Sequence, residues 1–203
     1  DGDIWTSAGI TAGMDLADVR YNAITWTHRA TRGWSYGGGI IDPRSGEIIK
    51  GYVNLGSQRV RQDLLIAEGL LAAHAREADP ALKQQALDMA LARLRQLAAH
   101  EVGHALGFAH NFAASRTGNG SVLDYPHPII TLDDAGRVQL AQPYGVGVGD
   151  WDKYVVAHAY GEFAAKDEGV ALATLRRDIA ARGYRYVSDA DARAPGDSHP
   201  DGL

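Results

Sequence analysis

Three of the chain's eight histidines lie within residues 100–110, HEVGHALGFAH, and a glutamate directly follows the first of them. Side chains four residues apart lie on one face of an α-helix, so His100 and His104 can present two imidazole nitrogens to one metal ion. Glu101 projects about 100° further round the helix. It is therefore poorly placed as a ligand, but it can reach a water molecule on the open side of the ion.

A third ligand from this stretch requires the helix to end. If the helix continued, His110 would face elsewhere, whereas Gly107 tolerates the positive φ that lets a chain leave a helix and turn back. We expect the helix to stop at Gly107 and His110 to reach the same ion. Three neutral nitrogens and a water molecule make a tetrahedral catalytic zinc site with one exchangeable position.

This donor set predicts the hydrolysis of an amide bond. Zn²⁺ lowers the pKa of a bound water to about 7 and polarises a carbonyl group. Glu101 would take a proton from the attacking water and deliver it to the leaving amine, without a covalent intermediate. Two alternatives stay open, namely a zinc site that has lost catalysis and histidines that merely line a helix with a glycine cap.

The periodicity of the apolar residues predicts the elements that position this motif. Aromatic and β-branched residues indicate a strand over residues 18–27 and two strands around a turn in residues 34–56. Apolar residues at helical spacing predict helices from Ser57 to about His74, from Pro80 to Gly107, and over residues 149–163 and 168–183.

The last residues, 188–203, have turn composition and no apolar period. We expect them to be mobile, or docked only against protein outside this sequence. Asp189, Asp191 and Asp197 offer oxygen atoms of the kind that calcium favours, but they lack a glycine-centred ligand loop. In the N-terminal part of the chain, we interpret Trp26 and Trp34 as core residues.

The composition is ordinary for a globular protein, with 45% hydrophobic and 22% charged residues. The net charge of −5 and the absence of a Lys and Arg cluster argue against a nucleic-acid partner. No apolar run approaches the roughly 18–20 residues that span a bilayer. The chain has no cysteine, which excludes disulfides, thiolate zinc ligands and cysteine nucleophiles.

Several sequence blocks carry a resemblance to a known family. They are DVRYNAITW, RGWSYGGGIIDPRSGEIIKGYVNLGSQRVRQDLLIAEGLL, QLAAHEVGHALGFAHNF, SVLDYP, GDWDKY and DADARAPG, and they span most of residues 18–200. The histidine motif resembles that of the metzincin clan of zinc endopeptidases. Together the blocks resemble large bacterial zinc-dependent metalloproteases with a met-zincin catalytic core, formerly classed as domains of unknown function. The resemblance implies one catalytic Zn²⁺ held by His100, His104 and His110, Glu101 as general base, and a polypeptide substrate.

Metzincins carry a tight turn with a methionine beneath the metal, and SVLDYP is the corresponding segment. Leu123 stands where the metzincins have methionine, and the chain's two methionines, Met14 and Met89, both precede the motif. The exchange nearly conserves volume and usually costs less than about 1.5 kcal/mol, so we expect an altered hydrophobic floor and retained zinc binding. The resemblance implies that Tyr125 is a fifth ligand or donates a hydrogen bond to the tetrahedral intermediate. A tyrosine that only packs the turn is the alternative.

The predicted fold class is α+β and metzincin-like. It has a small twisted mixed sheet packed on two long helices, one of them the active-site helix, and a mostly helical C-terminal lobe. Residues 1–110 would form the N-terminal lobe and residues 111–203 the C-terminal lobe of one catalytic domain. We expect this domain to be truncated at both ends, with flanking domains in a larger parent chain.

In metzincins the edge strand of the sheet pairs with extended substrate. The segment KGYVNLG, with Tyr52, Val53 and Asn54, is the candidate for this strand, although a strand inside the sheet would have the same pattern. The predicted function is that of a zinc-dependent endopeptidase. The alternatives are a zinc hydrolase acting on another amide and a catalytically silent metzincin-like module that binds peptides or a partner. The resemblance also implies a periplasmic or extracellular location.

Overall fold

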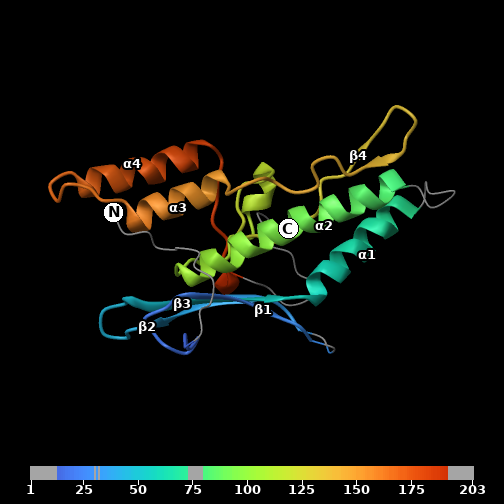
Figure 1. Ribbon diagram of the computed structural model, residues 1–203. Coiled ribbons are helices and arrows are strands. Elements are labelled where there is room, and N and C mark those ends of the chain that lie inside the picture. The colour runs from blue at the N-terminus through green and yellow to red at the C-terminus, as the bar shows by residue number, and fades with distance from the viewer. Residues whose placement is uncertain (1–12, 30, 32, 73–79, 192–203) are drawn as a thin grey trace.

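The computed structural model describes residues 13–29, 31, 33–72 and 80–191. A three-stranded sheet lies at its base, built from β1 (Ala23–Thr27), β2 (Tyr36–Ile41) and β3 (Ile48–Gly56) (Figure 1). The strand order is β1-β3-β2, with β1 parallel and β2 antiparallel to β3. The mixed sheet and the turn between β2 and β3 confirm the sequence prediction for residues 34–56.

The first strand is shorter than the predicted range 18–27. The ammonium group of the buried Lys50 donates hydrogen bonds to the carbonyl oxygens of Leu16, Asp18 and Tyr21 at 2.6–2.8 Å. These carbonyls turn towards a cation instead of joining a strand ladder. Residues 18–22 are therefore irregular, and β1 begins at Ala23.

The sheet order overturns the choice of Tyr52, Val53 and Asn54 as the substrate-binding edge strand. These residues lie in β3, which is hydrogen-bonded to β1 on one side and to β2 on the other. Its main-chain groups are already paired, so β3 has no free edge to offer a peptide. Among the described strands, β1 and β2 are the two edges of this sheet.

The two predicted long helices are present, and the active-site helix packs on one face of the sheet. They are α1 (Gln58–Ala72) and α2 (Pro80–Ala105), which pack along each other. Only the C-terminal half of α2 lies on the sheet, whereas α1 lies beyond the end of the sheet (Figure 1). One hydrophobic core lies where α1 and α2 meet the C-terminal part of the chain, with the buried side chains Ala67, Leu71, Ala86, Met89, Leu140 and Tyr144. A second, smaller core joins α2 to β3 through Val53, Leu55 and Ala105.

Glycine permits the close approach of α2 to the sheet. A Cβ atom added at Gly37 of β2 would lie 1.9 Å from the carbonyl oxygen of Glu101. Any side chain at this position would therefore push α2 away from β2. The GGG run of β2 thus brings the sheet edge directly against the helix that carries the histidine motif.

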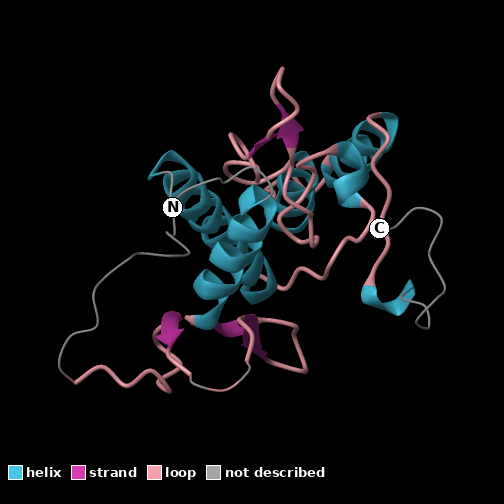
Figure 2. Ribbon diagram, turned by 90° about the vertical axis from the view of Figure 1, so that its right-hand side faces the viewer, coloured by secondary structure: helices cyan, strands magenta, loops and turns pink. Residues whose placement is uncertain are grey.

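The rest of the chain is mostly helical or irregular. It contains a short hairpin, β4 (Thr131–Leu132) and β5 (Val138–Gln139), two 3₁₀ turns, Ala114–Thr117 and Asp189–Asp191, and the helices α3 (Asp150–Tyr160) and α4 (Glu168–Ala181) (Figure 2). Both predicted C-terminal helices are therefore present. The α+β fold class with a small mixed sheet and four helices is confirmed.

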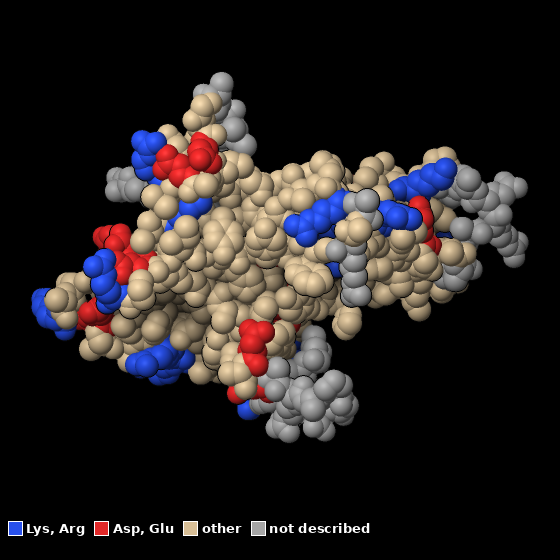
Figure 3. Space-filling model, turned by 90° about the horizontal axis from the view of Figure 1, so that it is seen from below, with Lys and Arg blue, Asp and Glu red and all other residues tan. Residues whose placement is uncertain are grey.

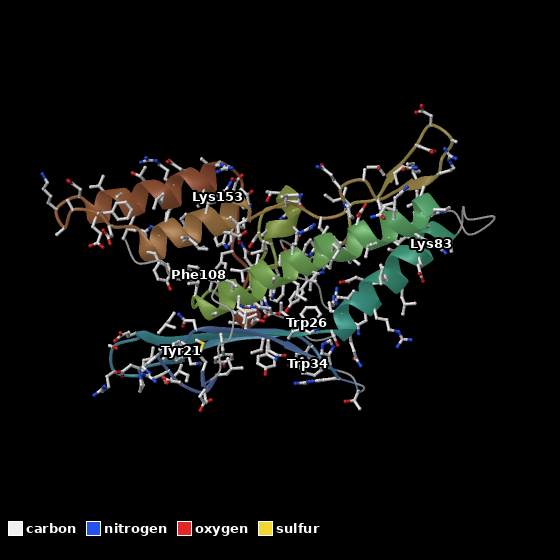
Figure 4. All side chains as sticks on the ribbon, viewed as in Figure 1. Tyr21, Trp26, Trp34, Lys83, Phe108 and Lys153 are labelled. Atoms are coloured by element: carbon white, nitrogen blue, oxygen red, sulfur yellow. The ribbon has the colours of Figure 1, made fainter. Side chains whose placement is uncertain are left out.

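The interpretation of Trp26 and Trp34 as core residues is wrong. Their exposed fractions are 41% and 72%, and both lie at the end of the sheet next to the start of α1 (Figure 4). The sheet has only three described strands, so its small core cannot enclose the two tryptophan side chains at its end.

Seen from the sheet side, charged side chains lie mainly towards the margins of the molecule (Figure 3). No described helix is long and apolar enough to cross a membrane.

Candidate metal centre

The three histidines of the motif converge on one point. His100 and His104 project from the same face of α2, and His110 returns from the loop that follows. The Nε2 atom of His104 lies 3.1 Å from Nε2 of His100 and 3.1 Å from Nε2 of His110. Ligands held tetrahedrally at about 2.0–2.1 Å from zinc are about 3.4 Å apart, so this spacing fits one zinc ion.

The hydrogen bonds of the other ring nitrogens fix how these histidines are oriented. Nδ1 of His100 lies 2.7 Å from the carbonyl oxygen of Val122, and Nδ1 of His104 lies 2.8 Å from that of Phe108. Carbonyl oxygens only accept hydrogen bonds, so each Nδ1 carries the proton and each Nε2 directs a lone pair to the shared point. Converging lone pairs repel one another unless a cation lies between them. The donor set therefore fits a metal ion.

The turn at Gly107 brings His110 to the other two ligands, as predicted. Gly107 has a φ of 88°, in the left-handed region that favours glycine. The N–H of Phe108 donates to the carbonyl of Gly103 at 3.1 Å, and the N–H of Gly107 donates to that of His104 at 3.0 Å. These two bonds form a Schellman motif, which ends the helix and redirects the chain.

Glu101 is buried, with 4% of its surface exposed, next to the histidine cluster. Burial raises the pKa of its carboxyl to about 7, while a hydrogen bond from the main chain of Gly37 and the charge of Arg93 act in the opposite direction. A carboxyl whose pKa lies near neutrality can both accept and return a proton. The chemistry of this position therefore suits a general base.

Leu123 packs against the helix that carries the histidine motif. Its side chain is 1% exposed and packs against α2 at Gly103, where an added Cβ would lie 2.8 Å from the Leu123 Cδ2 atom. Its carbonyl accepts a hydrogen bond from the N–H of Asn111 at 2.8 Å, next to the third histidine. The leucine thus forms an apolar floor in contact with the helix that carries two of the ligands.

Tyr125, two residues further on, lies at the open side of the cluster. Its hydroxyl is 2.9 Å from Nε2 of His110, and half of the side chain is exposed. The phenol is therefore within reach of an ion held by the histidines and of a substrate bound to that ion. Its role as ligand or hydrogen-bond donor stays a prediction.

Comparison with known families identifies this arrangement. Residues 82–202, more than half of the chain, match a family model described as Met-zincin. The chain belongs to the Met-zincin family. The match begins in α2, contains the whole histidine motif and the Leu123 turn, and places the chain with the metzincin-clan zinc metalloproteases. No curated protein and no solved structure matches the chain.

In this Met-zincin a carboxylate that the sequence pattern did not reveal orients the third histidine. The two carboxylate oxygens of Asp189 lie 2.9 and 3.0 Å from Nδ1 of His110. The prediction that residues 188–203 are mobile or undocked is thus wrong for residues 188–191, and residues 192–203 lie outside the described chain. Asp189 is 79 positions away from His110, so periodicity could not connect them.

Two buried polar residues hold the segments that supply these contacts. The carboxylate of Asp152, in α3, accepts hydrogen bonds from the N–H of Val122 at 2.9 Å and from the Ser121 hydroxyl. The side chain of Asn111, which is fully buried, donates to the carbonyl of Arg185 and accepts from the N–H of Val187. Both lie in blocks that carry the family resemblance, GDWDKY and QLAAHEVGHALGFAHNF, but the partners of these two residues cannot be deduced from the blocks.

Proposed function

We propose that the chain is a zinc-dependent endopeptidase. The observation that carries this proposal is the convergence of three Nε2 lone pairs beside a buried glutamate, in a chain of the Met-zincin family. His100, His104 and His110 would hold one Zn²⁺ through Nε2. The bound ion would lower the pKa of a water molecule to about 7 and polarise the carbonyl of the scissile bond.

The remaining chemistry belongs to two side chains of the protein. The Glu101 carboxylate accepts a proton from the attacking water and returns it to the nitrogen of the leaving amine. Burial raises the pKa of this carboxyl above its usual range, which favours the return of the proton to the leaving amine. The Tyr125 hydroxyl donates a hydrogen bond to the oxygen on which negative charge develops.

The edge strand that could pair with a substrate is β2, in place of β3. Among the described residues β2 has a strand partner on one side alone, and its Gly37 touches the main chain of Glu101. An extended peptide added to this edge would gain main-chain hydrogen bonds and pass next to the general base. The contact between Gly37 and α2 thus supports β2 as the strand that aligns the substrate.

The domain organisation and the location of the protein are proposed from the family resemblance. Residues 1–110 and 111–203 would form the two lobes of one catalytic domain, within a longer parent chain that acts in the periplasm or outside the cell. A catalytically silent module that binds peptides is the second candidate, because a complete histidine cluster is compatible with zinc binding without turnover.

The test combines zinc content and peptide cleavage on the same preparations. The parent protein, Glu101→Gln and the matched control Glu68→Gln, an exposed residue of α1, are loaded with zinc and incubated with casein peptides. We expect about one zinc per chain in all three, and cleavage by the parent and the control alone. Zinc binding without cleavage by the parent would favour the silent module, and a folded protein that takes up no zinc would refute the metal site.

A further inference from the structure

A cavity of about 200 Å³ opens next to the general base. It is smaller than the pockets that hold drug-sized ligands, so it suits one side chain of a peptide. Its walls come from the segment just before β2, from the end of β3, from α1 and from α2. Its polar and charged members include Arg59, Gln62, Arg93, Glu101 and Tyr125. Since Glu101 and Tyr125 belong to the proposed catalytic site, the cavity continues directly from that site.

One face of α2 connects this cavity to the metal centre. Arg93, Leu97 and Glu101 are spaced four residues apart and therefore lie in a row along the helix. The row begins with a guanidinium group and ends with the carboxyl that would activate water. A side chain that enters the cavity beside Glu101 thus points along α2 towards Arg93.

Arg93 carries a buried positive charge with unused hydrogen-bonding capacity. The residue is 5% exposed, and its Nη1 atom has no hydrogen-bond partner in the part of the chain that the structure describes. Its guanidinium carbon lies 5.5 Å from the centre of the Tyr144 ring, a contact that supplies attraction but no acceptor. Burial, followed by the charge of Arg59, lowers the pKa of Arg93, which is consistent with a cation that lacks a direct acceptor.

The other charged side chains near the cavity leave the Arg93 guanidinium able to bind an acidic group. The fully buried carboxylate of Asp63 forms an ion pair with Arg59, at 3.0 Å between Asp63 Oδ1 and Arg59 Nη2. Asp63 also attracts Arg93 electrostatically, and Arg59 repels it. Glu101, at the end of the cavity next to the metal centre, is engaged by the main chain of Gly37. The two arginines thus face one carboxylate that is already paired and one that serves the reaction.

We propose that this cavity binds the acidic side chain of a substrate residue that flanks the scissile bond. The carboxylate of a substrate glutamate or aspartate would accept hydrogen bonds from the Arg93 guanidinium, at the end of the cavity away from Glu101. This inference rests on the proposed endopeptidase function and names its substrate class. It gives a ligand-binding reason for a buried cation whose Nη1 atom has no acceptor among the described residues.

The main test compares peptides that differ only in one residue next to the cleaved bond. Sets with Glu, Gln or Lys at either flanking position are cleaved by the zinc-loaded parent, by Arg93→Met and by Arg95→Met, an exposed arginine of the same helix. A charge-assisted hydrogen bond predicts that the parent prefers Glu over Gln by about 10- to 100-fold in kcat/KM at one position. Arg95→Met should keep this ratio and Arg93→Met should lose it. A parent that cleaves the Glu and Gln peptides equally well would overturn the inference and leave the endopeptidase proposal intact.

A binding measurement separates the two proposals. Calorimetric titration of zinc-loaded Glu101→Gln with the Glu and Gln peptides reports the preference without turnover. If the parent cleaves no peptide but the Glu peptide binds more tightly, the cavity assignment holds and the endopeptidase proposal fails. Equal binding of both peptides, or no binding of either, would refute the cavity assignment.

Thermal unfolding distinguishes a binding role of Arg93 from a structural one. Replacing a poorly compensated buried charge by an apolar side chain of similar length is commonly neutral or stabilising. We therefore expect Arg93→Met to have an unchanged or higher Tm than the parent. A fall of several degrees in Tm would mean that Arg93 supports the fold through Tyr144, and would contradict the inference.

Discussion

Asp189 connects the histidine cluster to a segment that is distant in the sequence, because its carboxylate contacts His110. His110 is the one ligand of the cluster that does not lie on α2, and the Asp189 carboxylate holds its Nδ1–H at 2.9–3.0 Å. In Asp189→Asn the side-chain volume is kept and the negative charge is lost. The amide can still accept a hydrogen bond, but it no longer raises the basicity of the imidazole or favours its orientation as strongly.

The magnitude follows from the exposure of the pair. Loss of a carboxylate that supports a metal-ligating histidine commonly lowers metal affinity by about 10- to 100-fold. The Asp189 side chain is 63% exposed, so water screens its charge, whereas His110 is 16% exposed. We therefore expect the lower end of this range, about a tenfold rise in the zinc Kd, which corresponds to about 1.4 kcal/mol.

The assay is competition for zinc between the protein and a chromophoric chelator of known affinity. Asp178→Asn is the matched control, because its side chain is also 63% exposed and lies in α4 as a partner of Arg177. Far-ultraviolet circular dichroism checks that both variants are folded. Equal zinc affinity of Asp189→Asn, Asp178→Asn and the parent would refute the idea that Asp189 orients His110.

Two further predictions concern stability. Leu123→Met should change the free energy of unfolding by less than about 1.5 kcal/mol and keep zinc binding. Leu123→Ala should lower the free energy of unfolding by about 2–5 kcal/mol, because the Leu123 side chain is 1% exposed. Urea unfolding measures both changes, and an equal effect of the two substitutions would contradict the packing of Leu123 against α2. Burial raises the pKa of Asp63 above its ordinary 3.8, so the folded protein binds this proton more tightly than the unfolded chain does. Relative to Asp63→Asn, the parent should therefore lose stability as the pH rises from about 4 through the raised pKa, and a stability difference that does not vary with pH would contradict this.

The sequence predicted the parts of the site that are local along the chain. The four-residue spacing of His100 and His104 and the freedom of Gly107 are properties of a helix and its end, and both appear in the structure. The helices and the β2–β3 hairpin could be predicted for the same reason, since apolar periodicity reports which face of an element is buried. Local pattern therefore predicted the histidine cluster and most of the fold.

Most of the features that the sequence did not predict depend on contacts between distant segments. Strand order cannot be read from a strand's own residues, so the pattern of β3 fits an edge strand equally well, although β3 lies in the centre of the sheet. Lys50 shortened β1 by binding carbonyl groups that precede it. Asp189 lies in a segment without any apolar period, yet it contacts a metal ligand. Long-range polar contacts of this kind leave no periodic trace in a sequence.

The histidines are oriented by three separate parts of the chain, which explains why α2 alone could not form this centre. The Nδ1–H of His104 is satisfied locally by Phe108, but that of His100 depends on Val122, which is held in turn by Asp152 of α3. His110 depends on Asp189 beyond α4. All of these groups lie within the region that matches the Met-zincin family.

The elements before that region contribute a different part of the site. The sheet meets Glu101 at Gly37, and α1 supplies Arg59 to the cavity that ends at Arg93. These contacts touch the proposed general base and the proposed substrate pocket, but none of them orients a histidine ring. On the proposed function, we therefore expect metal binding to depend on residues 82–202, and the choice of substrate to depend on how the preceding sheet and helix pack against α2. Substitutions in β2 or α1 should accordingly alter which peptides are cleaved before they alter zinc affinity.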